Sequence, residues 1–132
     1  MKIRANQLSS YLKNSLAPCY LVTGDEHLLV SEALDEIREA AKAKGFANRE
    51  LHVATTGFDW GALTASTGNM SLFAEQRIVE LRLPTGKPGR AGGQAIVDLA
   101  AQAGPELLFI VTGPKLDRGT ANSKWAKTLD KI

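Results

Sequence analysis

The chain has 132 residues, a length that suits one domain of ordinary size. Its 44% hydrophobic and 23% charged residues are typical of a soluble globular protein, and its net charge of +2 is too small to indicate nucleic-acid binding by itself. No apolar run approaches the roughly 20 residues that cross a bilayer, and the N-terminus has no signal-peptide pattern. The single cysteine, Cys19, excludes an internal disulfide, so we expect a cytoplasmic protein and no membrane partner.

Hydrophobic periodicity predicts the first elements. Apolar residues at helical spacing predict a helix over residues 6–16, and the apolar run Cys19–Thr23 predicts a buried strand. The next helix is expected to begin after Asp25 and Glu26, which can cap it, and to stop at Gly45. Its buried stripe is expected to consist of Leu29, Ala33, Ile37 and Ala40.

Two further strands are expected around a short helix. Leu51 and Val53 alternate with polar neighbours and predict the second strand. Asp59 is a suitable N-cap for a short helix that begins at Trp60. The run Ile78–Leu83 predicts the third strand.

The last part of the chain begins with a glycine- and proline-rich stretch. Residues 84–93 predict a flexible loop, and the helix that follows is expected to end at Gly104. The run Leu107–Val111 is the most hydrophobic, as a central parallel strand should be. Trp125 and Leu129 mark the inner face of a last helix.

Strands that alternate with helices imply parallel βαβ units with right-handed crossovers. We therefore expect an α/β fold in three layers, with a mostly parallel sheet of about four strands flanked by helices. Residues 1–132 are expected to form a single domain. Because no strand follows the last helix, the chain looks like a piece of a longer protein.

The turn after the first strand stands where a nucleotide-binding α/β protein has its phosphate loop, Gly-x-x-x-x-Gly-Lys-Ser/Thr. Here the segment Gly24–Ser31 has no second glycine and no lysine. Asp25 and Glu26 would place negative charge at the helix N-terminus, where a phosphate would otherwise bind. The sequence therefore predicts a degenerate, non-binding phosphate loop at Gly24, Asp25 and Glu26, and no nucleotide cofactor.

No catalytic or metal site is expected elsewhere. His27 and His52 are too few to bind a metal together with Cys19, and their spacing matches no ligand pattern. Cys19 opens a buried strand, so we expect a small core residue rather than a nucleophile.

An apolar pair, Leu72 and Phe73, lies within the short connection Met70–Ala74. Gly68 and Asn69 break the preceding helix, so this run begins in a turn. Large apolar residues in such a place either close the core or form a docking plug for another protein. The residues alone leave both interpretations open.

Three stretches of the chain resemble the N-terminal domain of the delta subunit of the bacterial DNA polymerase III clamp loader. Singly each motif is weak, but their order and spacing along the whole chain are fairly specific. The stretches are Tyr20–Glu26; Met70–Ala74 followed by Gln76-Arg77; and Gly113–Asp117 followed by Asn122–Trp125.

The resemblance implies a RecA/AAA+-like domain that has lost nucleotide binding and that grips and opens the β sliding clamp. It places the clamp-binding site at Met70, Ser71, Leu72, Phe73 and Ala74, with the Leu-Phe pair entering an apolar pocket of the clamp. It implies a catalytically inert subunit of a holoenzyme with DNA-directed DNA polymerase activity, a nucleotidyltransferase. The delta prime and gamma/tau subunits would be its partners in the full-length protein. The family's lid and C-terminal oligomerisation domains are absent from these residues.

Two other functions stay open. One is an active P-loop NTPase, against which the missing lysine argues. The other is a nucleic-acid-binding α/β module, for which Lys115, Arg118 and Lys124 are the candidate contacts with DNA or with a partner. In the clamp-loader interpretation, contact with DNA would be indirect.

Overall fold

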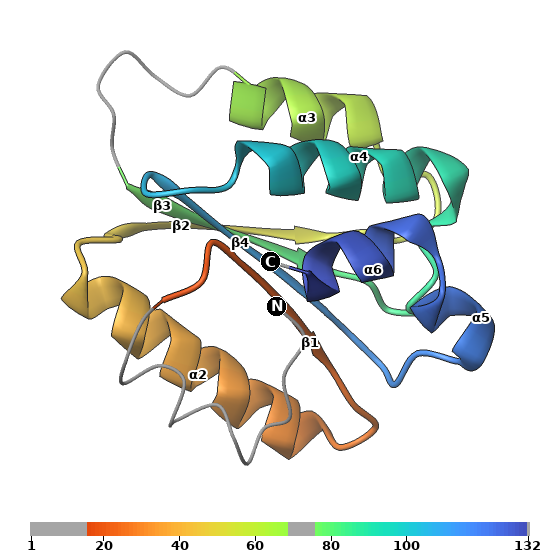
Figure 1. Cartoon of the computed structure of the whole chain (residues 1–132), viewed down its shortest axis with the longest axis horizontal. Coiled ribbons are helices and arrows are strands. Elements are labelled where there is room, and N and C mark those ends of the chain that lie inside the picture. Colours follow the sequence, from red (N-terminus) through yellow and green to blue (C-terminus); the bar gives the residue numbers. More distant parts are fainter. Residues whose placement is uncertain (1–15, 69–75, 132) are drawn as a thin grey trace.

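The fold is a parallel sheet with helices on both faces (Figure 1). The computed structural model describes residues 16–68 and 76–131. Its four strands are hydrogen-bonded in the order β1-β4-β3-β2. They are β1 (Cys19–Thr23), β2 (Asn48–Val53), β3 (Arg77–Arg82) and β4 (Leu107–Gly113). The predicted α/β class, strand number and parallel pairing are confirmed.

The helices divide between the two faces of the sheet, as Figure 1 shows. The helix α2 (His27–Ala43) covers one face. The helices α3 (Trp60–Gly68), α4 (Gly89–Gln102) and α6 (Lys124–Asp130) pack on the other, and the short α5 (Arg118–Ala121) precedes α6. The three layers are therefore as predicted. The helix predicted over residues 6–16 lies outside the described residues apart from Leu16.

Two apolar clusters, one on each side of the sheet, form the core. Strand β4 lies between β1 and β3, and its residues Leu107–Thr112 are all buried, as predicted for the most hydrophobic run. Side chains of β4 alternate between the clusters, so that Leu108 packs toward α2 and Phe109 toward α4 and α6. No helix among the described residues is long and apolar enough to cross a membrane.

The buried stripe of α2 differs from the prediction. Leu29 is 47% exposed, and Ala40 is only partly buried. The buried face of α2 is turned slightly from the predicted one, so that Ala41 is buried in place of Ala40 and Leu34 is buried beside Ala33. The buried residues of α2 are Ala33, Leu34, Ile37 and Ala41.

The predicted caps are partly confirmed. Asp59 Oδ1 accepts a hydrogen bond from the backbone N–H of Ala62 at 3.0 Å, so it caps α3 as expected. Glu26 occupies the N-cap position of α2, but its side chain makes no capping hydrogen bond. Gly45 ends α2 with a φ of +100°, a conformation that favours glycine.

The loop predicted over residues 84–93 is wrong in its second half, because α4 already begins at Gly89. Gly92, in the first turn of this helix, has a packing role. A Cβ on Gly92 would lie 2.6 Å from Cζ2 of Trp60, so the absence of a side chain lets α3 and α4 approach closely. Composition alone does not reveal this contact.

Candidate functional site

The segment predicted to be a degenerate phosphate loop follows the carboxyl end of β1, at the end of the sheet where open α/β proteins bind ligands. The backbone N–H of Gly24 donates to the carbonyl of Gly113 at 3.2 Å, which ties the loop to the end of β4. A cavity of about 360 Å³ opens here between the loop, the first turns of α2 and the ends of β3 and β4. Gly24 and Asp25 line it, whereas Glu26 is not among its lining residues.

The chemistry of this cavity does not suit a nucleotide with its magnesium ion. Its lining has no lysine, and the end of β3 contributes Arg82, Leu83 and Pro84 rather than an acidic pair. Asp25 is exposed, and its Oδ1 accepts from the backbone N–H of Lys115 at 3.4 Å. A carboxylate at this position repels phosphate. Within residues 16–68 and 76–131, no group of three His, Cys, Asp or Glu side chains is arranged to hold a metal ion.

Cys19 is fully buried at the start of β1, as predicted for a core residue. Burial raises the pKa of its thiol to about 11, because the thiolate would lose its hydration. A neutral thiol is a poor nucleophile at neutral pH. His52 is held elsewhere, with Nε2 at 3.4 Å from Glu50 Oε2 on the neighbouring part of β2.

The predicted clamp-binding residues Met70, Ser71, Leu72, Phe73 and Ala74 lie outside the described residues. The elements on either side are α3, which ends at Gly68, and β3, which begins at Arg77. The connection therefore returns to the sheet at the amino end of β3, the edge opposite to the phosphate loop.

The chain is firmly held where this connection enters β3. Gln76 Nε2 donates to the carbonyl of Pro105 at 3.0 Å. The backbone N–H of Arg77 donates to the carbonyl of Glu106 at 3.0 Å, and Arg77 Nη1 lies 3.0 Å from Glu50 Oε1. The side chains of Gln76 and Arg77 are therefore already engaged within the domain.

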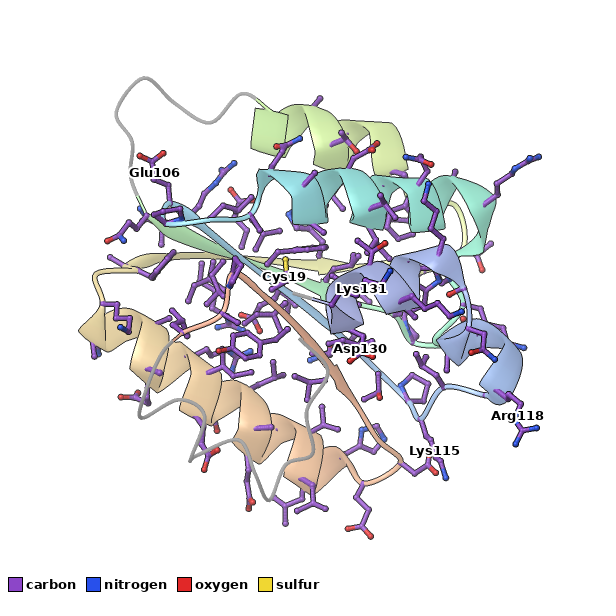
Figure 2. All side chains as sticks on the ribbon, viewed as in Figure 1. Cys19, Glu106, Lys115, Arg118, Asp130 and Lys131 are labelled. Carbon is purple, nitrogen blue, oxygen red and sulfur yellow. The ribbon has the colours of Figure 1, made fainter. Side chains whose placement is uncertain are left out.

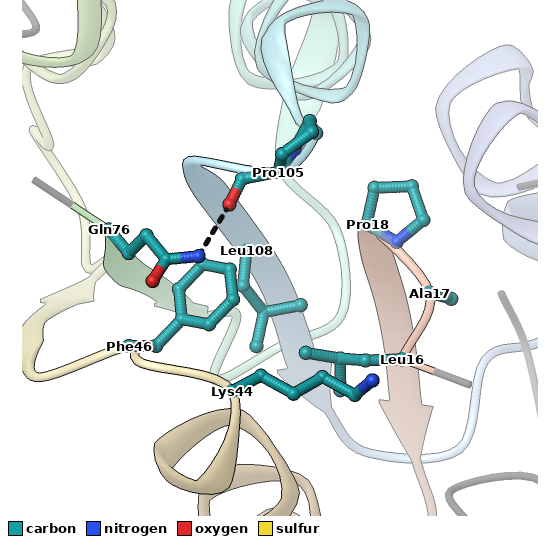
Figure 3. Close-up of a pocket in the computed structure, with 9 residues that line it drawn as sticks. Leu16, Ala17, Pro18, Lys44, Phe46, Gln76, Pro105 and Leu108 are labelled. Carbon is teal, nitrogen blue, oxygen red and sulfur yellow. Dashed lines mark hydrogen bonds between the residues drawn. The ribbon is translucent and has the colours of Figure 1, made fainter. Parts of the chain in front are cut away.

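A second cavity, which sequence reasoning missed, lies at this same edge (Figure 3). Its volume is about 380 Å³. It is lined by residues that are far apart in the sequence, from the segment before β1, the end of α2, the entry to β3 and the turn before β4. No local pattern signals such a site, because only the fold brings these segments together.

The candidate DNA or partner contacts are all on the surface at the other end of the sheet. Lys115 follows β4, Arg118 opens α5 and Lys124 opens α6, and all three are exposed. Figure 2 shows Lys115 and Arg118 pointing away from the body of the domain. Asp117, between them, accepts from the backbone N–H of Thr120 at 2.7 Å, and this bond lowers the pKa of its carboxyl group.

Comparison with known proteins identifies the family. The sequence pattern described as "DNA polymerase III, delta subunit" matches residues 20–132. DNA polymerase III subunit delta of Escherichia coli (strain K12) is 31% identical over 129 residues, which cover 98% of this chain and 38% of that protein. The protein of the same name from Haemophilus influenzae is 28% identical over 130 residues, with the same coverage. The chain thus spans 38% of the length of these relatives. On these matches, the chain belongs to the DNA polymerase III delta subunit family.

Proposed function

We propose that this chain is the clamp-binding and clamp-opening domain of the replicative DNA polymerase III clamp loader. It docks on the β sliding clamp through a plug formed by Leu72 and Phe73. The observation that carries the proposal is the family match over residues 20–132, which includes the Met70–Ala74 segment.

The energetics of docking require more than the plug. Complete burial of a leucine and a phenylalanine contributes about 1.5–3 kcal/mol each. Association costs several kcal/mol, so two anchors alone bind weakly. Glu75, Gln76 and Arg77 are the nearest polar residues in the sequence, but Gln76 and Arg77 already have partners within the domain. Further contacts with the clamp must therefore come from other residues at the amino end of the parallel strands.

Clamp opening follows from differential affinity. A binding protein shifts an equilibrium only by the difference in its affinity for the two states. We infer that the domain binds a clamp whose subunit interface has sprung open more tightly than a clamp whose interface is relaxed and closed. No nucleotide is needed on this chain for that step, because its phosphate-loop cavity lacks the lysine and the acidic pair. In the full assembly, ATP on neighbouring subunits would control exposure of the plug.

A contact with DNA is a second proposed role, supported by the exposure of Lys115, Arg118 and Lys124. Cations that neutralise phosphates release counterions, so DNA affinity would fall steeply with salt. A shallow salt dependence would assign these residues to ordinary solvated surface.

The docking proposal is tested with the double variant Leu72→Ala/Phe73→Ala and a purified bacterial β sliding clamp. We expect clamp affinity to fall by about 100-fold or more, because losing two anchors of about 1.5 kcal/mol or more each costs two factors of ten. The matched control is Leu28→Ala/Leu29→Ala, an apolar pair in α2 that is 69% and 47% exposed and should leave affinity unchanged. A correctly folded Leu-Phe variant that binds like wild type would refute the docking role.

A further inference from the structure

The cavity at the amino edge of the sheet has the properties of a receptor for a protein side chain. Its walls are largely apolar, and Figure 3 shows Leu16, Phe46 and Leu108 converging on it. A volume of about 380 Å³ is near the lower end of the roughly 300–1,000 Å³ of small-molecule sites. Apolar walls offer water few hydrogen-bond partners, so an apolar occupant is favoured.

One charged group marks the rim. Lys44, the C-cap residue of α2, lines the cavity, and Figure 3 shows its side chain extending beside Leu16. Of the lining residues that the structure describes, only Lys44 is charged, and its ammonium group forms no ion pair with a residue in 16–68 or 76–131. The other polar side chain, Gln76, donates its amide to Pro105. The charge that complements this rim is a carboxylate.

The cavity adjoins the proposed docking segment. Gln76 is one of its lining residues and follows Ala74 by two positions, so the two Cα atoms are separated by no more than about 7.6 Å. A protein that takes up Leu72 and Phe73 would therefore bind within a few residues, along the chain, of a residue that lines this cavity. The docking plug needs additional contacts. Lys44 at the rim and the apolar walls of the cavity can provide them.

We propose that this cavity is a second contact site for the sliding clamp, and that it receives an apolar side chain of the clamp flanked by a carboxylate. The proposal rests on the clamp-docking function. The clamp side chain enters between Phe46 and Leu108, while its neighbouring carboxylate pairs with Lys44. Leu72 and Phe73 of the domain would then bind in a pocket of the clamp, and an apolar side chain of the clamp would bind in this cavity.

Two variants test the site by independent routes. Lys44→Glu reverses the charge at the rim, and Lys42→Glu is its matched control, because Lys42 is exposed in the last turn of the same helix but does not line the cavity. Gly104→Phe adds a ring at the cavity wall, at a position where a Cβ meets no atom within 4 Å. Circular dichroism and thermal melting confirm that each variant folds.

We expect Lys44→Glu to weaken clamp binding by about threefold to fivefold, the range of an exposed ion pair, and Lys42→Glu to leave it unchanged. Gly104→Phe should weaken binding by about tenfold, the loss of one apolar anchor. Wild-type affinity in both Lys44→Glu and Gly104→Phe, or an equal loss in Lys42→Glu, would overturn the proposal.

The outcome is separable from that of the docking function. If Leu72→Ala/Phe73→Ala abolishes binding while Lys44→Glu and Gly104→Phe do not affect it, docking stands and the second site is overturned. If the cavity variants alter self-association of the chain, measured by sedimentation, but leave clamp affinity unchanged, the occupant is a second copy of the chain and the proposal is also overturned.

Discussion

Arg38 of α2 donates from Nε to Oε2 of Glu80 in β3 over 3.2 Å and thereby joins residues 42 positions apart. Glu80 is only 2% exposed, although it is charged. Arg49, at the start of β2, donates to the same carboxylate oxygen. One buried carboxylate therefore connects α2 and the edge strand β2 to the middle of the sheet.

Replacing Glu80 by glutamine should destabilise the domain strongly. The change leaves two guanidinium groups without a carboxylate, and breaking a buried ion pair costs about 3–5 kcal/mol. Because Arg38 and Arg49 are 26% and 44% exposed, water compensates in part, and we expect a loss of about 2–3 kcal/mol in the free energy of unfolding. Urea denaturation measures it.

The control for Glu80→Gln is Asp35→Asn. Asp35 also pairs with Arg38, at 3.2 Å, but on the helix surface. Its loss should change the free energy of unfolding by no more than about 0.5 kcal/mol. Equal effects of the two variants would show that burial of Glu80 adds nothing to the pair.

Gly92→Ala should destabilise the packing of α3 on α4. The added methyl group would lie 2.6 Å from Trp60 Cζ2 and 2.7 Å from Pro88 Cβ, so the helices must move apart. Overpacking of this kind costs about 1–3 kcal/mol. A calorimetric melting temperature several degrees below wild type is the expected result, and Trp60 fluorescence should report the shift.

Gly61→Ala provides the opposite case within α3. Its Cβ would make only an ordinary contact, 3.4 Å from Asp59 Oδ1, and alanine is favoured over glycine in a helix by about 0.5–1 kcal/mol. This variant should melt at or above the wild-type temperature. If Gly92→Ala behaves in the same way, the close approach of Trp60 is not a constraint.

The buried thiol of Cys19 should make stability fall at high pH. Its pKa is about 11 in the folded chain and 9.0 in an unperturbed cysteine, so the unfolded state loses the proton first. The stabilisation is complete below pH 9 and is lost as the pH rises to about 11, by an amount on the order of 2 kcal/mol. Urea denaturation at pH 8, 9, 10 and 11 measures the slope.

Cys19→Ala should reduce the fall in the free energy of unfolding between pH 9 and pH 11 without abolishing it. Burial also raises the pKa of the neighbouring Tyr20, whose hydroxyl oxygen accepts from the backbone N–H of Ala17 at 2.9 Å, and this group acts in the same direction. An unchanged slope in Cys19→Ala would show that the thiol titrates alike in the folded and unfolded states.

The sequence predicted elements well where the signal is local. The hydrophobic run at β4, the cap at Asp59 and the stop at Gly45 are all confirmed, because each depends on neighbours within a few residues. The absence of a lysine from Gly24–Ser31 is also read directly from the sequence, and the degenerate phosphate loop inferred from it stays a prediction. The role of Leu72 and Phe73 stays a prediction.

Tertiary packing decided the rest. Which face of α2 is buried, and that Leu51 and Val53 are exposed, depends on where the helix rests on the sheet, which periodicity does not specify. The partners of Glu80 and the walls of the amino-edge cavity come from segments dozens of residues apart. Parallel strands joined by crossover helices place such distant segments side by side, so these contacts exist only once the strand order is set.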